Sequence, residues 1–155
     1  MYKFLRPDLD ELLRKQAAIF TELKERGQDM GEANRQSSET WHDNAPLEVV
    51  QREFERLQRR YVELGVVIQQ AQVIIPSEMA SQVVSIGSVV TFTDQDNQEK
   101  TLKIGSYMPS DASGAISYEA PVAKLLIDNE VGDIVEGRIV GREVEYKILK
   151  IERWV

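Results

Sequence analysis

Cysteine is absent from the 155-residue chain, and histidine occurs only once, as His42. The chain therefore has no disulfide framework, no thiolate metal site and no cysteine nucleophile, and it cannot build a site that needs two imidazoles. No run of about 18 apolar residues occurs, so the sequence predicts no transmembrane helix. The stretch MYKFLRPDLDEL contains early acidic residues and lacks the apolar core of a signal peptide. We therefore expect a soluble, cytoplasmic protein.

Basic residues are few relative to acidic ones, with 19 Lys and Arg against 26 Asp and Glu and a net charge of −7. Residues 1–75 carry 11 basic and 13 acidic side chains, a net charge of −2, and residues 76–155 carry the remaining 8 and 13, a net charge of −5. General binding to duplex DNA depends on basic side chains that neutralise phosphates. The composition disfavours that function, although it is compatible with a local basic stripe.

Two apolar repeats in residues 1–75 are typical of paired helices. Their steps alternate between three and four residues, as in the seam of a coiled coil. The first repeat consists of Leu5, Leu9, Leu12, Gln16, Ile19, Leu23, Arg26 and Met30, with Leu13 and Phe20 widening its face. The second consists of Leu47, Val50, Phe54, Leu57, Tyr61, Leu64, Ile68 and Ala71. The sequence predicts two long helices that pack along these seams.

The stretch between the repeats is polar and contains helix-capping residues. Gly27 and Gly31 each cost roughly 1 kcal/mol against alanine in a helix, so we expect the first helix to fray toward Ser37. Asp43 or Asn44 suits the N-cap of the second helix, and Pro46 suits its first turn. The pattern predicts an antiparallel helical hairpin over residues 1–75, with a polar tip at residues 37–46.

After AQVIIPSEM the period of the pattern changes to two. SVVTFTDQDNQEKTLKIGSY predicts two strands joined by a turn at residues 94–98, and DIVEGRIVGREVEYKILKIERW predicts a hairpin that turns near Gly141 and Arg142. Between them, Pro121 opens a short helix through Ile127. The expected fold class is α+β, with a small antiparallel sheet packed by one helix over residues 76–155.

Three stretches resemble a known family. They are the joint AQVIIPSEM, the pattern ISYEAPVAKLLIDNEVGDIVE followed by EVEYKILKIE, and Asp-Asn-Ala at residues 43–45. Together with the hairpin they resemble the bacterial GreA/GreB transcript-cleavage factors over essentially the whole chain. That family often has Ser-Pro-Ile-Ala where this chain has Ala-Pro-Val-Ala at residues 120–123, and Glu-Asn-Ala at the tip.

The resemblance implies an N-terminal antiparallel coiled coil and a C-terminal domain of FKBP-like fold. In the family, the C-terminal domain docks on RNA polymerase at the mouth of the secondary channel, and the coiled coil enters the channel. The tip then reaches the polymerase active centre. The implied protein is a monomer that stimulates the polymerase's own cleavage of backtracked RNA and is not an enzyme by itself. The nascent RNA 3′ end is a further possible contact.

The family tip reads Gly-Asp-Leu-x-Glu-Asn-Ala-Glu-Tyr, and it aligns on the shared Asn44 and Ala45. The family glutamate then falls on Asp43, its leucine on Trp41, its aspartate on the neutral Thr40 and its glycine on Glu39. Hydrolysis at a two-metal centre needs a second Mg²⁺ about 3.5–4 Å from the first, and carboxylates are the ligands Mg²⁺ prefers. The resemblance therefore implies that Asp43 holds Mg²⁺ shared with the polymerase. A separate hypothesis is that a one-residue readjustment of the loop lets Glu39 act as the second acid.

Thr40 supports an alternative function. With Asp43 as the single acid in place, the factor would occupy the channel without cleaving RNA and would regulate transcription or compete with cleavage factors. A third hypothesis, from a different class, is a structural or chaperone-like hairpin with another partner, because coiled-coil hairpins are common adaptors.

The remaining candidate residues each have a structural and a functional interpretation. Trp41 covers the open end of the helix pair or contacts polymerase, and His42 is a solvated loop residue or a proton-transfer group. The basic stripe of the second helix pairs with neighbouring glutamates or contacts RNA and acidic channel walls. Its members are Arg52, Arg56, Arg59 and Arg60. Glu119 and Pro121 form a tight turn or the polymerase-binding loop, with Ala120 replacing the family serine. No aromatic cluster is expected in TLKIGSYMPSDASGAISYEA, which disfavours prolyl isomerase activity.

Overall fold

The computed structural model describes residues 1–37, 45–76 and 81–155 of the chain. These residues form two units: Met1–Asp10 together with Ala71–Val155, and Glu11–Gln70. The division between Gln70 and Ala71 lies close to the boundary expected near residue 75, and strand β1 (Tyr2–Phe4) pairs in parallel with β2 (Ala71–Val73). The first ten residues therefore belong to the sheet-containing unit, although the predicted division placed them in the helical hairpin.

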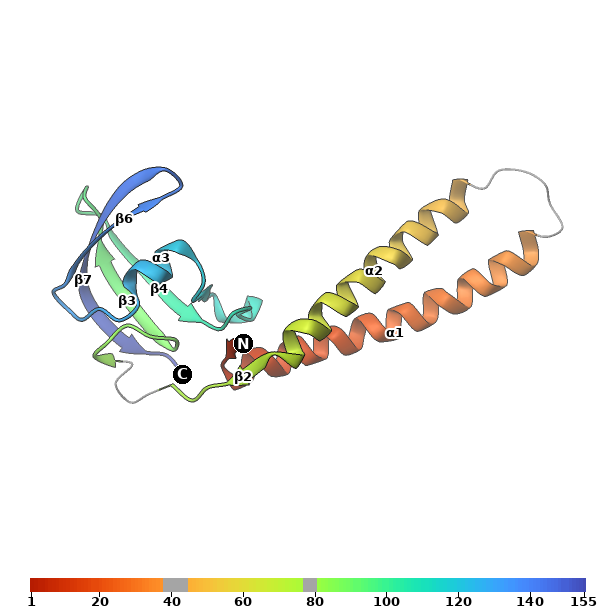
Figure 1. Ribbon diagram of the computed structural model, residues 1–155, viewed down its shortest axis with the longest axis horizontal. Coiled ribbons are helices and arrows are strands. Elements are labelled where there is room, and N and C mark those ends of the chain that lie inside the picture. The colour runs from red at the N-terminus through yellow and green to blue at the C-terminus, as the bar shows by residue number, and fades with distance from the viewer. Residues whose placement is uncertain (38–44, 77–80) are drawn as a thin grey trace. The chain divides into compact units, whose positions relative to one another are not determined.

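Two long helices form the helical unit, and they run antiparallel (Figure 1). Helix α1 spans Arg6–Ser37 and helix α2 spans Ala45–Gln69. The Gln16 amide donates a hydrogen bond to the Tyr61 carbonyl (3.4 Å), and Arg26 pairs with Glu53 farther along the helices (2.5 Å). A later residue of α1 thus contacts an earlier residue of α2, which confirms the predicted antiparallel hairpin.

The side chains that the hairpin buries are largely those of the predicted seams. All eight residues of the first repeat are buried or half-buried, and Leu12 and Leu64 are nearly inaccessible. Leu13 is 42% exposed and does not widen the face, whereas the Phe20 ring, although 54% exposed, lies beside the Tyr61 ring of α2 with centroids 5.8 Å apart. At the end of the second repeat, Ala71 lies in β2 and not in α2.

Helix α1 continues through Gly27 and Gly31 and ends at Ser37, the residue toward which the sequence predicted it to extend. An added Cβ at Gly27 would lie 3.8 Å from the Phe54 ring, and the neighbouring Arg26 is held by Glu53 of α2. Packing against the second helix stabilises this part of α1 despite the low helix propensity of glycine. This packing is seen at Gly27, whereas an added Cβ at Gly31 would meet nothing within 4 Å, and fraying toward Ser37 stays a prediction.

A curled five-stranded sheet forms most of the second unit (Figure 1). Its strands lie in the order β5-β4-β3-β7-β6 and are antiparallel, except that β5 pairs in parallel with β4. The strands are β3 (Ser88–Thr93), β4 (Glu99–Gly105), β5 (Ile116–Ser117), β6 (Ile134–Ile139) and β7 (Arg142–Arg153). The short 3₁₀ helix η2 (Asp111–Ser113) precedes β5. The α+β fold class is confirmed.

The two predicted hairpin turns have different chemistry. In the β3–β4 turn the Asp94 carboxylate accepts the N–H groups of Asp96 (2.9 Å) and Gln98 (3.0 Å). The Gln98 N–H and the nearby Lys100 ammonium hold the pKa of Asp94 below its usual value. The β6–β7 turn lies at Val140 (φ 50°) and Gly141 (φ 75°), one residue earlier than expected. Positive φ at both positions is the backbone of a type I′ turn, which matches the strand twist.

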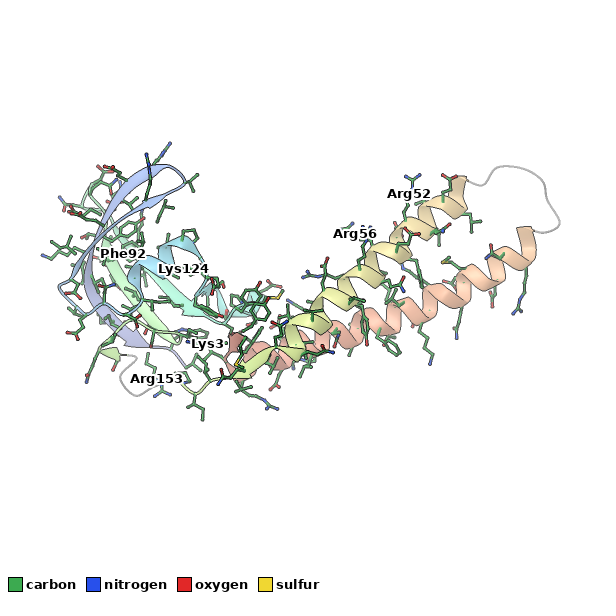
Figure 2. The ribbon with its side chains drawn as sticks, in the orientation of Figure 1. Lys3, Arg52, Arg56, Phe92, Lys124 and Arg153 are labelled. Atoms are coloured by element: carbon green, nitrogen blue, oxygen red, sulfur yellow. The ribbon has the colours of Figure 1, made fainter. Side chains whose placement is uncertain are left out.

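Helix α3 (Pro121–Leu126) packs on one face of the sheet and closes its core. Ala123 and Leu126 are fully buried against sheet residues that include Phe92 (Figure 2). The rings of Phe92 and Tyr146 meet edge to face, with centroids 4.7 Å apart. Gly137 of β6 brings the sheet close to α3, because any Cβ there would collide with the Leu125 side chain.

The close approach of the Gly137 backbone to the Leu125 side chain leads to a prediction about stability. In Gly137→Ala the new Cβ would lie 2.7 Å from Leu125 Cδ1, so we expect overpacking to lower the free energy of unfolding by about 1–3 kcal/mol. Urea denaturation measures this change. In a Leu125→Ala background the obstacle is gone and the penalty should shrink, so an equal penalty in both backgrounds would contradict the packing explanation.

A buried carboxylate fastens the start of α1 within the sheet unit. Asp8 is 3% exposed; its carboxylate accepts the Ser106 hydroxyl and the Ser110 N–H, the latter at 2.9 Å. The Ser106 oxygen accepts the Leu5 N–H at 2.8 Å. Asp8 lies in the first turn of α1, and these bonds connect it to residues about 100 positions away in the sequence.

Asp8→Ala should be more destabilising than the same change two residues later. Removal of the carboxylate leaves the buried donors of Ser106 and Ser110 unsatisfied, and we expect a loss of about 1–3 kcal/mol in the free energy of unfolding. Asp10 pairs with Arg6 on the surface (3.0 Å), so Asp10→Ala should cost less than about 1 kcal/mol. Urea denaturation of both variants measures the difference. Equal losses would show that the Asp8 network contributes nothing specific.

Candidate functional site

The predicted tip residues Glu39, Thr40, Trp41, His42, Asp43 and Asn44 lie outside the described residues. The flanking helices define where this segment joins the rest of the chain, because α1 ends at Ser37 and α2 begins at Ala45. Pro46 is the second residue of α2, as its preference for a first turn predicted. Within residues 1–37, 45–76 and 81–155, no group of three or more acidic or histidine side chains is placed to hold a metal ion.

The four arginines of the predicted basic stripe are exposed on α2, and they divide into paired and unpaired members. Arg52 pairs with Glu48 (3.4 Å) and Arg60 with Glu63 (3.6 Å), one helical turn away in each case. Arg56 and Arg59 make no ion pair with any described residue. Figure 2 shows Arg52 and Arg56 projecting from α2. Such exposed pairs contribute little to stability. The structural interpretation is confirmed for Arg52 and Arg60, and contact of the stripe with RNA or channel walls stays a prediction.

A hollow of about 590 Å³ lies beside this stripe, within the helical unit. Arg26 of α1 lines it and pairs with Glu22 (2.9 Å) and with Glu53 (2.5 Å). The hydrogen bond to Glu53 raises the pKa of Arg26. The other lining residues are Arg56, Leu57, Arg59, Arg60 and Glu63. With two unpaired guanidinium groups at its wall, the hollow suits a phosphate or carboxylate better than a cation.

The segment that contains Glu119 and Pro121 leads into α3, and we call residues 117–121 the α3 entry loop. Pro121 is the first residue of α3, and the preceding Ala120 provides no side-chain cap. The Glu119 carboxylate is 2.5 Å from the Lys124 ammonium, and both side chains are largely exposed. Figure 2 shows Lys124 on α3. The tight turn that was predicted here is present, and it presents an acidic side chain at the surface.

Ser117 organises this loop, although the sequence analysis did not select it. Its hydroxyl donates a hydrogen bond to the Tyr107 carbonyl (2.8 Å) and accepts the Glu119 N–H (3.2 Å). Its carbonyl accepts the Ala120 N–H at 2.9 Å, which closes a four-residue turn. A serine two residues before an exposed acid is a recognisable signal for a side-chain-supported turn, and it was available in the sequence.

An aromatic cluster next to the loop was also missed. The rings of Tyr2 and Tyr107 stack with centroids 4.1 Å apart, and Tyr118 lies 6.5 Å from Tyr107. The Tyr107 N–H donates to the Lys3 carbonyl (3.0 Å), and the Lys3 N–H donates to the Tyr118 hydroxyl (3.2 Å). The phenol of Tyr2 and partial burial raise the pKa of Tyr107. The expectation of no aromatic cluster was wrong, because Tyr2 contributes from β1; the cluster holds that strand on the unit.

Comparisons with known proteins identify the family. A family model described as "Transcription elongation factor, GreA/GreB, C-term" matches residues 79–153. The "Transcription elongation factor GreA" of Nautilia profundicola is 36% identical over 111 residues, which are 70% of this chain and 68% of that protein. The chain belongs to the GreA/GreB family of transcription elongation factors. The factor of the same name from Lachnoclostridium phytofermentans is 32% identical over 84% of this chain and 81% of its own length.

The region matched by the GreA/GreB family model, residues 79–153, includes the α3 entry loop and all five strands of the larger sheet. Among solved structures, the GreA factor homolog 1 protein of Thermus thermophilus aligns over 97% of both chains, with 21% identity and a TM-score of 0.45. Across the described helices of this GreA/GreB family member, none is long and apolar enough to cross a membrane.

The arginines on the helical unit make a prediction about stability. Arg26→Gln removes a guanidinium that joins α1 to α2, so we expect a small decrease in the midpoint of thermal unfolding at low salt and a smaller one at high salt. Arg59→Gln is the matched control: it removes the same charge from a residue without an ion pair among the described residues, and it should leave the midpoint unchanged. Circular dichroism at two salt concentrations measures both variants. Equal effects would contradict a cross-helix role for Arg26.

Proposed function

We propose that this GreA/GreB family member binds bacterial RNA polymerase at the secondary channel and stimulates cleavage of backtracked RNA by the polymerase active site. The observation that carries the proposal is the similarity to two transcription elongation factors at 36% and 32% identity. The helical hairpin supports it, because a helix rises about 1.5 Å per residue and the 25 residues of α2 reach far along a narrow channel.

The α3 entry loop is the proposed contact with the polymerase. Glu119 is exposed and accompanied by a single cation, Lys124, so a basic side chain of the partner can share its carboxylate. Pro121 fixes the backbone beside it. Surface charge pairs of this kind steer association and weaken with salt, so polymerase binding should fall as ionic strength rises.

The tip is the proposed working end of the factor. Asp43 and Glu39 supply the two carboxylates of the segment, and carboxylate oxygens fit Mg²⁺ by their chemistry. A second Mg²⁺ at the polymerase centre would activate the attacking water and stabilise the charge of the leaving oxygen. Asp43 and Glu39 would orient that ion, while His42 would lie near the reacting water and Trp41, Thr40 and Asn44 would contact the channel. The unpaired Arg56 and Arg59 would face extruded RNA or acidic channel walls.

A cleavage assay on a backtracked elongation complex tests this function. With Mg²⁺ and 3′-labelled RNA, we expect the protein to release short 3′ fragments. Asp43→Asn and Glu39→Gln should each abolish most of that release without loss of polymerase binding, because they remove a metal ligand and preserve size. Fragment release that both variants retain would exclude the acid pair, and release without added polymerase would exclude a role as an accessory factor.

A second function is favoured by Thr40, which stands where the family has an aspartate. In this alternative the protein occupies the channel without cleavage and competes with cleavage factors or alters pausing. Binding without fragment release in the same assay would support it. Thr40→Asp should then create cleavage if the missing acid is the sole defect, and an inert variant that still binds would contradict that explanation. Failure to bind polymerase even at low salt would favour the adaptor hypothesis over both functions.

A further inference from the structure

The α3 entry loop has no side-chain cap from the residue that would normally provide one. Ala120 occupies the N-cap position of α3 with φ −62° and ψ 141°, and its methyl group forms no hydrogen bond. Ser, Thr, Asp and Asn are preferred at N-caps because their side chains accept a free N–H of the first turn. Some other contact must therefore hold the backbone that leads Glu119 and Pro121 to the surface.

Ser117 holds this backbone through its side-chain hydroxyl and through its own carbonyl group. The hydroxyl accepts the Glu119 N–H and donates to the Tyr107 carbonyl, while the Ser117 carbonyl accepts the Ala120 N–H. Glu119 is thus held at its backbone by Ser117 and at its carboxylate by Lys124, 2.5 Å away. These contacts stabilise the observed arrangement of the loop without any partner present.

The support of Ser117 extends into the sheet. Ser117 is the last residue of β5 and pairs with Gly105 of β4. A Cβ at Gly105 would lie 2.9 Å from both Ala115 Cβ and Pro109 Cβ, so the segment before Ser117 packs tightly on β4. Tyr107, the hydrogen-bond acceptor of Ser117, is held in turn by its N–H bond to the Lys3 carbonyl. Ser117 therefore anchors the loop to the sheet, and Tyr118 adds a second anchor to β1, because its hydroxyl accepts the Lys3 N–H at 3.2 Å.

We propose that Ser117 is a positioning residue for polymerase binding, which holds the α3 entry loop so that Glu119 and Pro121 are presented in the bound conformation. The inference rests on the proposed function and adds a residue outside the pair that contacts the partner. A loop ordered in advance loses less conformational entropy on binding, so loss of this support lowers affinity without removal of any contact group.

Ser113 provides a matched control in the same unit. Its hydroxyl donates to the Ser110 carbonyl (2.7 Å) and accepts the Ala115 N–H (3.1 Å), so it supports a turn in the same way as Ser117. Both serines are half-buried. Ser113→Ala therefore removes the same two kinds of hydrogen bond as Ser117→Ala, but from a turn that does not contain Glu119.

The test measures binding of the full-length protein to bacterial RNA polymerase, with thermal unfolding of each variant alongside. Ser117→Ala removes two side-chain hydrogen bonds, and we expect it to weaken binding about three- to tenfold, the range that corresponds to the net contribution of about one such bond. Ser113→Ala should bind within about twofold of the unchanged protein, with a similar decrease in the unfolding midpoint. Ser117→Thr keeps the hydroxyl and should bind like the unchanged protein, and we expect the Glu119 N–H to exchange faster in Ser117→Ala than in Ser117→Thr.

Two results would overturn the inference alone: binding by the unchanged protein that Ser117→Ala leaves intact, or an equal loss in Ser113→Ala, which would indicate general destabilisation. Absence of binding by the unchanged protein would instead overturn the proposed function and this inference with it. The two failures are therefore distinguishable in one titration series.

Discussion

The seam between α1 and α2 is the constraint on which the helical unit depends. Helices in water are marginal unless an apolar face is buried, since nucleation is costly and each residue adds little. In this protein the burial is narrow: it follows every third or fourth side chain of α1 and leaves neighbouring apolar residues such as Phe20 exposed. Because the seam uses so few positions, the remaining faces are available for charged groups, including the unpaired Arg56 and Arg59.

Polar residues within the seam fix how the helices pair. Gln16 bonds to the Tyr61 backbone, and Arg26 takes a seam position yet pairs with Glu53 of α2. Groups of this kind contribute less than apolar packing but disfavour a shifted register, because a slip would leave them without partners. The pairing therefore determines which residues stand at the turn of the hairpin, where the proposed catalytic acids lie in the sequence.

The sheet unit presents the α3 entry loop on a tightly packed core. Its core of side chains from the sheet and α3 is continuous, and the glycines at positions 105 and 137 allow backbone and side chains to approach closely. On that base, Ser117 and Lys124 hold Glu119 from two sides. In the proposed function the two units have different roles. The sheet unit presents the α3 entry loop to the polymerase, and the helical unit carries the acidic tip between its paired helices.

The sequence by itself determined the elements whose signals are local and periodic. The three-four repeat predicted both helices and the period-two stretches predicted the main strands, because apolar periodicity directly reflects which face is buried. Pro46 and Pro121 were correctly placed in first turns from backbone geometry alone. The family was recognisable from short motifs, and the Glu119 segment was identified as a candidate contact.

Tertiary structure decided what depends on distant partners. The pairing of β1 with β2, the burial of Asp8 under Ser106 and Ser110, and the stacking of Tyr2 on Tyr107 join residues about 70 to 100 positions apart. Helix α1 continues past Gly27 because α2 packs against it, which propensity alone does not predict. The hydrogen bond from the Ser117 hydroxyl to the Tyr107 carbonyl exists only because the fold brings the two groups together. A local sequence pattern indicates whether a residue prefers a buried face or a turn. The tertiary fold determines which distant residue forms a hydrogen bond with its polar group.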